Sequence, residues 1–235
     1  MSQGSALPKY LGLSEMLIRE IAAGHLPDGT RLPPEREMAA EHGVSVGTLR
    51  KALADIEEKG LLTRVQGSGN YIRAGEASSA VYAFFRLELL RGGGLPTARV
   101  LSVSREAKPA DAPDFGPSPQ AHRIRRVRAL GGTEIALEEI WLDGDRAAGI
   151  AAADLSESLY LYYRDQLGLV IATAEDRVGL GAVPGWAGED FHLAAGAPAG
   201  LIERIGRAQD GARVEYSRTW FDADRARYVS RMGKG

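Results

Sequence analysis

The chain of 235 residues is 44% hydrophobic and 26% charged, with a formal net charge of −2. Its length favours two domains, its composition is that of a folded globular protein, and its balanced charge excludes a uniformly basic binder of nucleic acids. The sequence has no cysteine, no apolar run that approaches the ~18 residues of a membrane span, and no signal-peptide pattern at its start. We therefore expect a cytoplasmic protein without disulfides, thiolate metal sites or membrane contact.

Three helices and a hairpin are predicted at the start of the chain. Apolar residues at helical spacing predict helices over 10–23 and 34–42, and a third helix follows with Ser45 as its N-cap. Alternating residues on either side of the turn 66–69 then predict a hairpin whose glycines supply positive φ at its tip. Two short helices joined by the residues HGVS and followed by a hairpin are typical of a winged helix-turn-helix, which we assign to residues 1–73.

The first turn of the third helix carries small or basic side chains opposite an apolar stripe. A helix that enters the major groove needs short residues for close approach, hydroxyls and amides for phosphates, and an arginine for guanine edges. We therefore expect contact with double-stranded DNA, with Arg31, Arg36 and Arg64 along the same backbone path. The alternative is an ordinary solvated helix face. The residues of this turn are Ser45, Val46, Gly47, Thr48, Arg50 and Lys51.

The remainder of the chain is predicted to form a second, strand-rich domain. Small and polar residues over 74–80 indicate a linker, after which an α+β domain covers 81–235. Its expected strands lie at 81–90, 98–107, 122–130, 134–142, 170–181, 200–209 and 213–222, with short helices at 158–167 and 188–194.

Two arginines mark one strand of this domain. Arg126 and Arg128 stand at positions i and i+2, which places both guanidinium groups on one strand face, where they can hold a phosphate or a carboxylate. A solvated strand face is the alternative interpretation. The four histidines have no ligand spacing, and the glycine run 179–185 lacks the ending of a phosphate loop, so we expect no metal and no cofactor.

The run LPPEREMAAEHGVSVGTLRKALADIEEKGLLTRVQGSGNYI at residues 32–72 closely resembles the GntR family of regulators. The family pattern reads LPSEReLA, then VSRxTVRxAL, then GLLxRxxGxGTFV, and the resemblance covers nearly all of residues 10–73. Carried over by position, it implies DNA contacts from the second helix, the third helix and the wing tip. The contact residues that we expect are Arg36, Ser45, Val46, Gly47, Thr48, Arg50, Gln66, Gly67, Ser68 and Gly69.

This chain departs from the family pattern at two positions of the third helix. Val46 stands where much of the family has an arginine, and Gly47 follows where a threonine or a similar residue is common. A valine can touch a thymine methyl group but cannot pair with guanine. We therefore expect a half-site that differs from that of the arginine-bearing members, with fewer contacts per subunit.

The strand-rich part resembles the UTRA effector domain of the HutC-like subfamily, whose fold is similar to chorismate lyase. The resemblance spans residues 81–228 and is looser than the first one. It rests on an R-x-R strand, a glutamate ten residues later, a Ser-Leu-Tyr helix start and a late Glu-Tyr-Ser strand. The corresponding residues here are Arg126, Arg128, Glu138, Ser158, Leu159, Tyr160, Glu215, Tyr216 and Ser217.

This second resemblance implies a site for a small molecule. Arg126, Arg128 and Ser158 would hold an anionic group, with Ser158 at a helix N-terminus where amides favour negative charge. Glu138 and Glu215 would accept hydrogen bonds from ligand hydroxyls or amines. Phe221 falls where sugar-phosphate sensors of this type often place a tyrosine, so we expect a more apolar or aromatic ligand than a plain sugar phosphate.

Together these patterns predict a homodimeric transcriptional regulator, most simply a repressor, whose operator affinity responds to a small anionic effector. Two alternatives remain open: a lyase-like enzyme fused to a DNA-binding domain, and a DNA binder that needs no ligand. The chain has no G-x-S-x-G motif, no metal-ligand cluster and no convincing general-base histidine, so we do not expect an enzyme.

Overall fold

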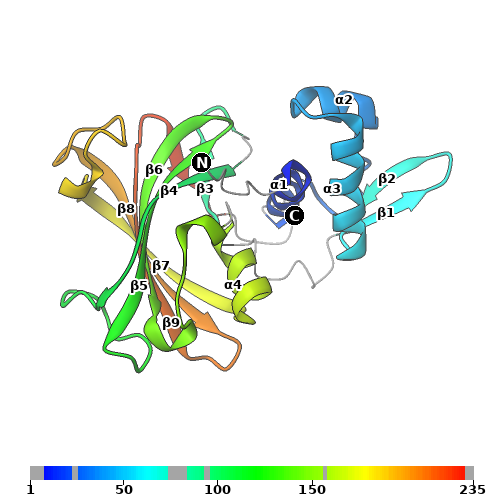
Figure 1. The fold of residues 1–235 in the computed structure, drawn as a ribbon. Helices are drawn as coiled ribbons and strands as arrows, with labels where there is room; N and C mark the ends of the chain where they lie inside the picture. The colour runs from blue at the N-terminus through cyan, green and yellow to red at the C-terminus, as the bar shows by residue number, and fades with distance from the viewer. Residues whose placement is uncertain (1–7, 23–25, 74–83, 93–95, 156–157, 231–235) are drawn as a thin grey trace. The chain divides into compact units, whose positions relative to one another are not determined.

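The computed structural model describes residues 8–22, 26–73, 84–92, 96–155 and 158–230 (Figure 1). The chain divides into two compact units, and the described residues change unit between 87 and 88 and again between 227 and 228. The first unit holds the predicted winged helix, and the second holds the predicted strand-rich domain, so the expected fold class is confirmed. The linker predicted at 74–80 lies outside the described residues. None of the described helices is long and apolar enough to cross a membrane.

The first unit is a bundle of three helices followed by a wing. Leu13 and Leu17 of the first helix and Leu49, Leu53 and Ile56 of the third are at most 3% exposed, and these side chains form its core. Burying such a stripe is what holds short helices together in water. The elements are α1 (Lys9–Ala22), α2 (Glu35–Glu41), α3 (Val46–Glu58), β1 (Leu62–Val65) and β2 (Gly69–Ile72).

The segment before α2 braces the wing. The Leu32 amide donates to the carbonyl of Asn70, and the Ile72 amide donates to the carbonyl of Thr30, each at 2.9 Å. Residues 29–32 therefore run beside β2 as a short third strand, which fixes the base of the hairpin while its tip, at Gly67, stays exposed.

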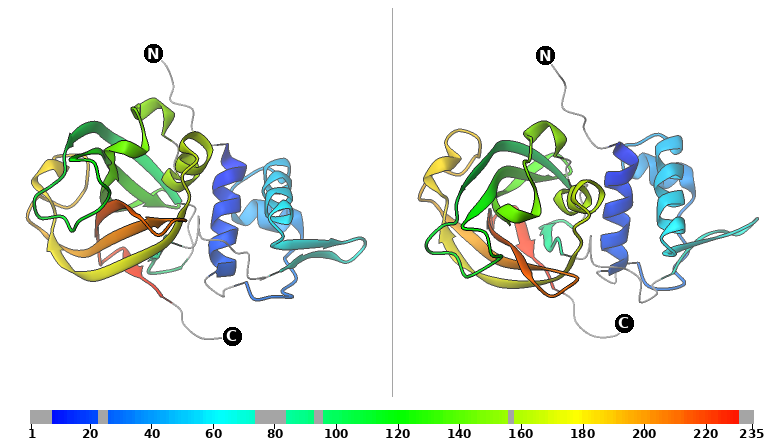
Figure 2. Two further views of the ribbon diagram at one scale, coloured as in Figure 1. Left: turned by 90° about the horizontal axis from the view of Figure 1, so that it is seen from below. Right: turned by 60° about the horizontal axis from the view of Figure 1, so that its bottom comes forward.

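The second unit is built on one six-stranded antiparallel sheet with the order β4-β5-β6-β9-β8-β7 (Figures 1 and 2). A separate two-stranded sheet pairs β3 with β10. The bounds are β3 (Leu87–Leu89), β4 (Pro96–Ala107), β5 (Gln120–Leu130), β6 (Thr133–Asp143), β7 (Ile171–Ala182), β8 (Pro198–Ala208), β9 (Arg213–Phe221) and β10 (Ala226–Tyr228), with helix α4 (Leu159–Leu167) between β6 and β7.

The two faces of the large sheet carry different side chains. On one face Val127, Leu137 and Trp220 lie opposite one another across β5, β6 and β9 and form an apolar cluster with Phe191 from the loop after β7. Because neighbouring residues of a strand point to opposite faces, Arg126 and Glu138 belong to the other face. Trp141 and Trp220 are core side chains, and Trp186 is partly buried against the same cluster as Trp220.

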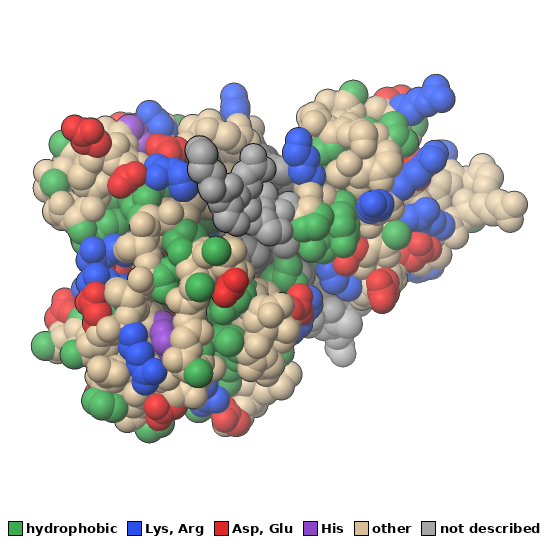
Figure 3. Space-filling view, in the orientation of Figure 1, with side chains coloured by type: hydrophobic (Ala, Val, Ile, Leu, Met, Phe, Trp, Pro, Cys, Tyr) green, Lys and Arg blue, Asp and Glu red, His purple; other side chains and the backbone are tan. Residues whose placement is uncertain are grey.

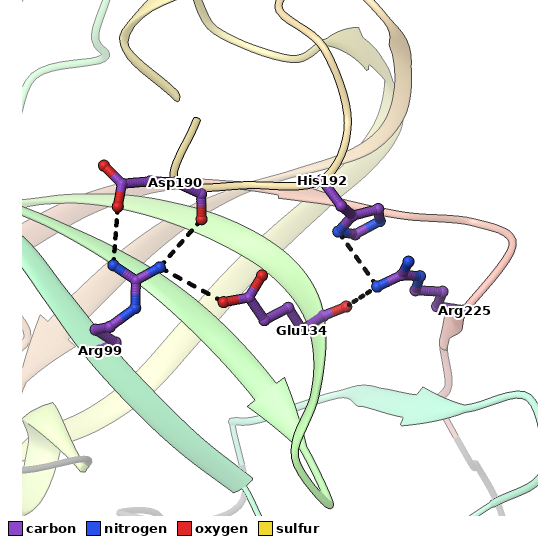
Figure 4. Close-up of polar contacts among 5 residues, drawn as sticks. All are labelled: Arg99, Glu134, Asp190, His192 and Arg225. Atoms are coloured by element: carbon purple, nitrogen blue, oxygen red, sulfur yellow. Dashed lines mark hydrogen bonds and ion pairs between the residues drawn. The ribbon is translucent and has the colours of Figure 1, made fainter. Parts of the chain in front are cut away.

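The loop over 184–197 is tied down by one ion pair and several side-chain hydrogen bonds (Figure 4). Arg99 of β4 donates to the Asp190 carboxylate at 2.9 Å and to its carbonyl at 3.1 Å. Arg225 donates to the Glu134 carbonyl at 3.1 Å and meets His192 Nδ1 at 3.3 Å. These contacts hold the loop against the turn between β5 and β6.

Two sequence predictions are corrected here, and one strand was missed. The helix expected at 188–194 is wrong: Gly188 has a φ of 55°, the only helical turn is a short one at Gly185–Ala187, and the following residues form turns that anchor Phe191. The strand expected at 81–90 is shortened to β3, since residues 84–86 are irregular and 81–83 lie outside the described residues. Strand β10 was not foreseen, because three residues give no periodicity to detect.

Candidate functional site

The first turn of α3 is capped by the residue that the sequence indicated. Ser45 precedes the helix in an extended conformation, and its hydroxyl accepts a hydrogen bond from the Thr48 amide at 3.1 Å and lies 2.9 Å from the Thr48 hydroxyl. The cap satisfies one of the first amides and leaves others at the helix start directed to solvent. Such amides, with the positive end of the helix dipole, are suited to an anion such as a phosphate.

The predicted DNA-contact residues lie on the outside of the winged helix, with most side chains exposed. The apolar stripe of α3 is fully buried, which turns Gly47, Arg50 and Lys51 outward. Arg36 of α2 is exposed too, while Val46 and Thr48 are half-buried. The wing-tip residues Gln66, Gly67 and Gly69 are exposed and Ser68 is half-buried.

A groove joins the wing to the start of α2. Its volume is about 500 Å³, and it is lined by the wing tip together with Arg31, Glu35 and Arg64. Arg50 of α3 reaches the same place, because its Nε donates to Glu35 at 2.6 Å and its carbonyl accepts from Arg64 at 3.5 Å. The structure thus brings α2, α3 and the wing together; Figure 3 shows Lys and Arg side chains between α3 and the wing.

The cations of this surface differ in how they are held. Arg50 pairs with Glu35, and Arg64 pairs with Glu57 at 2.8 Å, in both cases between largely exposed side chains. Within the described part of the chain, neither Arg31 nor Arg36 forms an ion pair. Arg31 packs so closely against the wing that a Cβ at Gly69 would lie 3.2 Å from its Nε, so that glycine leaves room for the arginine. Arg31 was considered from the sequence only as a flanking cation, and the groove adds it to the site.

In the second unit, the predicted ligand residues occupy adjacent rows across one sheet face. Residues directly opposite in register share a face, so Arg126 and Glu138 stand side by side. The next row runs from Arg128 through Ala136 to Phe221. Glu215 stands two rows away from Glu138 on the same face, opposite Leu142. All of these ligand-site residues are at least 91% buried when backbone and side chain are taken together, as is Ser158.

The two arginines share one carboxylate, that of Glu138. Arg126 donates to Oε2 of Glu138 through Nη2 at 2.6 Å and through Nε at 3.0 Å, whereas Nε of Arg128 is 3.6 Å from Oε1. Burial alone would raise the pKa of Glu138, but Arg126 and Arg128 together hold that pKa below its ordinary value. Glu138 is therefore ionised, and it orients Arg126 more firmly than Arg128.

Helix α4 covers this face through its own polar side chains. Ser158 is the N-cap, and its hydroxyl accepts from the Leu161 amide at 3.4 Å. The Tyr160 hydroxyl donates to Oε1 of Glu215 at 2.8 Å. Burial and the Glu215 carboxylate raise the pKa of Tyr160 well above its ordinary value, so this hydroxyl remains a donor.

Glu215 keeps one unused acceptor. Among the described residues its Oε2, which is buried, has no hydrogen-bond partner. Burial raises the pKa of Glu215, an effect only partly offset by the nearby hydroxyl groups of Tyr160 and Tyr163 and by the charges of Arg204 and Arg126. A buried carboxyl oxygen without a partner is uncommon and invites a donor from a bound molecule.

A second ion pair beside this site was missed from the sequence. Arg204 of β8 donates to both oxygens of Asp176 on β7, at 2.5 and 2.7 Å, and lies on the same face as Arg126. The hydrogen bonds to Asp176 raise the pKa of Arg204 despite its burial. The two residues are 28 positions apart, and only the strand order reveals that they are neighbours.

Phe221 serves the sheet as well as the site. Its ring lies over Gly200, the residue opposite it on β8, and a Cβ there would come within 2.2 Å of the ring. The glycine is therefore required for this ring position, which places an apolar surface in the same row as Arg128.

Two family models match the chain. The model described as "Bacterial regulatory proteins, gntR family" matches residues 9–72, and the model described as "UTRA domain" matches residues 91–227. The two matches coincide with the winged helix and with the large sheet.

Several relatives match over nearly their whole length. SmoD of Agrobacterium fabrum, an HTH-type transcriptional regulator, is 59% identical over 97% of this chain and 98% of its own. The transcriptional repressor NagR of Bacillus subtilis is 25% identical over 100% and 98% of the two chains. MngR of Escherichia coli, the repressor of a mannosyl-D-glycerate transport and metabolism system, is 28% identical over 92% of each.

Solved structures share the fold. The regulator YydK of Bacillus subtilis superposes with a TM-score of 0.53 at 22% identity, over 96% of this chain and 99% of its own. The ligand-binding domain of a GntR-family regulator from Bordetella bronchiseptica superposes with a TM-score of 0.56 at 18% identity, over 64% of this chain and 98% of its own.

Proposed function

The chain belongs to the GntR family of bacterial regulatory proteins and carries a UTRA domain, and on that premise we propose that it is a homodimeric repressor released from its operator by an anionic metabolite. It is a DNA-binding transcriptional regulator with an effector domain, as its relatives are. We assign residues 1–73 to DNA binding, 74–80 to a linker and 81–235 to effector binding, and we place the chain in the HutC-like subfamily.

On the DNA side, the first turn of α3 would enter the major groove. The exposed pair between Arg50 and Glu35 can open at little cost, which lets Arg50 exchange the carboxylate for a phosphate or a guanine edge. Val46 would meet a thymine methyl group. Arg31 and Arg36 would bind phosphates, and Gly67 would let the wing backbone approach the minor groove.

On the effector side, one observation carries the proposal: a buried arginine pair lies on the same sheet face as a carboxylate with an unused oxygen. An entering anion would compete with Glu138 for the guanidinium groups of Arg126 and Arg128. Glu138 and Oε2 of Glu215 would then accept hydrogen bonds from ligand hydroxyls. Ser158 would contribute the amides at the start of α4.

The relatives support both the direction of control and the class of ligand. NagR and MngR are named as repressors, which favours repression here. The system that MngR represses handles mannosyl-D-glycerate, a glycoside with a carboxylate. A sugar derivative carrying an acidic group matches the arginines and glutamates of this site, and Phe221 offers an apolar wall to the less polar face of such a ring.

A thermal-shift screen tests the ligand class directly. Glucose 6-phosphate, glucuronate and glycerate would serve as anionic probes, with glucose and glycerol as uncharged controls. We expect at least one anionic probe to raise the melting temperature of the chain, because a ligand of the native state stabilises it by RT ln(1 + [L]/Kd). The Arg128→Gln variant should lose this shift. Stabilisation by the uncharged controls alone would contradict an anion site.

The regulatory half of the proposal needs the operator. Selection of bound sequences from random double-stranded DNA would supply it, and the probe that raised the melting temperature should then lower operator affinity by about 5–150-fold, the usual range of such coupling. An affinity that does not change would leave a DNA binder without effector control.

Recovery of the probe unchanged after incubation would agree with binding without catalysis, and measured turnover would favour the lyase-like alternative. Because a bacterial operator lies in the cytoplasm, we propose that location for the protein.

A further inference from the structure

Arg31 lies on the short strand that precedes α2 and runs beside the wing. It forms a bridge with Tyr71 of β2, and the backbone hydrogen bonds of Leu32 and Ile72 on either side fix that pairing. Residues directly opposite each other on neighbouring strands point to the same face. Arg31 and Tyr71 therefore share one face of the wing, which projects beyond the three helices in Figure 1.

The Arg31 side chain extends from this position toward the wing tip. A Cβ at Gly69 would lie 3.2 Å from its Nε and 3.7 Å from its Nη2, so the guanidinium group reaches Gly69. Gly69 is two residues nearer the turn than Tyr71, a step of about 7 Å along a strand. A side chain at position 69 would crowd this path, and glycine leaves it open.

The turn beside this guanidinium group is fixed by two hydrogen bonds. The Ser68 amide donates to the Val65 carbonyl at 2.9 Å, and the Ser68 hydroxyl lies 2.6 Å from the Tyr71 hydroxyl. Arg31 is exposed, and no carboxylate of the described residues pairs with it. Its charge is therefore held at the wing tip without being neutralised, which suits the binding of a polyanion.

An apolar side chain lies at the same level of the wing. Val65 is directly opposite Gly69 in the register of β1 and β2, so it shares the face of Arg31. It is 46% exposed and is one of four large hydrophobic side chains that stand exposed in the described chain. Proteins that bind in the minor groove of DNA commonly combine arginine with exposed apolar side chains, and this face of the wing offers both.

We propose that Arg31 enters the minor groove beside each half-site and selects A·T base pairs there. A·T-rich DNA has a narrow minor groove whose strong negative potential attracts arginine, whereas the amino group of guanine occupies the groove in G·C pairs. The inference rests on the proposed function, in which the wing approaches the minor groove and Arg31 meets a phosphate. It carries the guanidinium group from the phosphates at the groove edge to the base pairs between them.

A minor-groove contact also complements the first turn of α3. Val46 cannot pair with guanine, so the major groove supplies fewer specific hydrogen bonds per half-site than an arginine at that position would give. Selection of flanking A·T pairs by Arg31 adds discrimination outside the bases that α3 reaches. The full recognition sequence is then longer than the half-site read by the helix alone.

Base analogues test the groove with the unmodified full chain. Sequences selected from random double-stranded DNA should carry A·T pairs next to the half-site, and replacing one of them with G·C should lower affinity by about fivefold or more. Inosine is guanine without the amino group, so an I·C pair has the minor-groove edge of A·T and the major-groove edge of G·C. Replacement with I·C should therefore keep affinity within about twofold of the A·T duplex. An I·C duplex that binds as weakly as the G·C duplex would overturn the inference.

Substitution of Arg31 tests the residue. Arg31→Lys keeps the charge, but an ammonium group is more strongly hydrated than a guanidinium group and enters a narrow groove less readily. We expect this variant to bind duplexes with A·T and G·C flanks with nearly equal affinity, while the salt dependence of binding is kept. Arg36→Gln, at an exposed arginine of α2, is the matched control. It should weaken binding to both duplexes by the same factor and leave the preference for A·T flanks unchanged.

The outcomes separate this inference from the proposed function. Selected sequences without A·T pairs beside the half-site, or an Arg31→Lys variant that keeps the preference for them, would overturn the minor-groove contact while operator binding stands. A chain that selects no DNA sequence would overturn the regulator, and the inference with it.

Discussion

The winged helix and the effector unit use charge in opposite ways. In the pair between Arg50 and Glu35 the side chains are 64% and 24% exposed, whereas in the pair between Arg126 and Glu138 they are 6% and 11% exposed. Exposed pairs contribute little and exchange partners easily, which suits a surface that must accept phosphates. Buried pairs are strongly oriented and costly to break, which suits a site that must recognise one molecule.

The largest expected effect is on the buried pair. Arg126→Met leaves the Glu138 carboxylate buried with only the longer contact to Arg128, and we expect a loss of about 3–5 kcal/mol in the free energy of unfolding of the effector unit. Urea denaturation followed by tryptophan fluorescence measures this unit specifically, because all three tryptophans lie in it. Arg50→Met, at the exposed pair, should lower the stability of the winged helix by less than about 1 kcal/mol, measured by circular dichroism because that unit contains no tryptophan. If both variants lowered the free energy of unfolding equally, the buried and exposed ion pairs would not differ in their contribution to stability.

A glycine of the sheet gives the next effect. Gly200→Ala places a methyl group within 2.2 Å of the Phe221 ring, and the forced displacement of the ring should destabilise the effector unit by about 1–3 kcal/mol. Gly185→Ala is the control, since a Cβ there meets nothing within 4 Å. The same fluorescence measurement applies. A neutral Gly200→Ala would mean that the ring can move freely, and Phe221 would then not form a fixed wall of the site.

Variants of the α3 cap residue, Ser45, test stability and DNA binding of the winged helix separately. Ser45→Ala removes the acceptor for the Thr48 amide and should lower the stability of this unit by about 1 kcal/mol. Ser45→Asp keeps a capping oxygen and should preserve stability, yet its charge should repel phosphate and weaken operator binding. Circular dichroism and an operator-shift assay measure the two quantities. Undiminished operator binding by Ser45→Asp would remove Ser45 from the contact surface.

The smallest effect is a difference in pH dependence between the two buried glutamates. The folded state lowers the pKa of Glu138, so its contribution to stability is present above its ordinary value of 4.5 and is lost as the pH falls further. The folded state raises the pKa of Glu215, so its contribution is full below 4.5 and is lost as the pH rises through the folded value.

Glu138→Gln should therefore flatten the acid side of the stability profile, and Glu215→Gln should flatten the side above pH 4.5. Urea denaturation across the pH range would measure both slopes by tryptophan fluorescence. If both variants flattened the same side of the stability profile, the electrostatic roles assigned to Glu138 and Glu215 would be incorrect.

Much of the fold followed from local patterns. The helices of the first unit, its hairpin and the long strands of the second unit are confirmed to within a few residues. The failures are instructive, because the segment 188–194 has helical composition but is kept out of a helix by Gly188 and by the ion pair between Asp190 and Arg99. Tertiary contacts outweighed a weak local preference.

The contribution of sequence alone differed between the two sites. The predicted DNA-contact residues at the start of α3 all lie within residues 45–50, and a cap followed by an apolar stripe is enough to decide which side of a helix faces outward, so Ser45 and Arg50 could be named without a structure. The effector face is assembled from five strands and one helix. The spacing of Arg126 and Arg128 could suggest an anion, but their pairing with Glu138, the open oxygen of Glu215 and the bond between Arg204 and Asp176 depend on strand order and register. Helical neighbours are set by a period of 3.6 residues, whereas strand neighbours are set by which distant segments pair, and only the tertiary structure decides that.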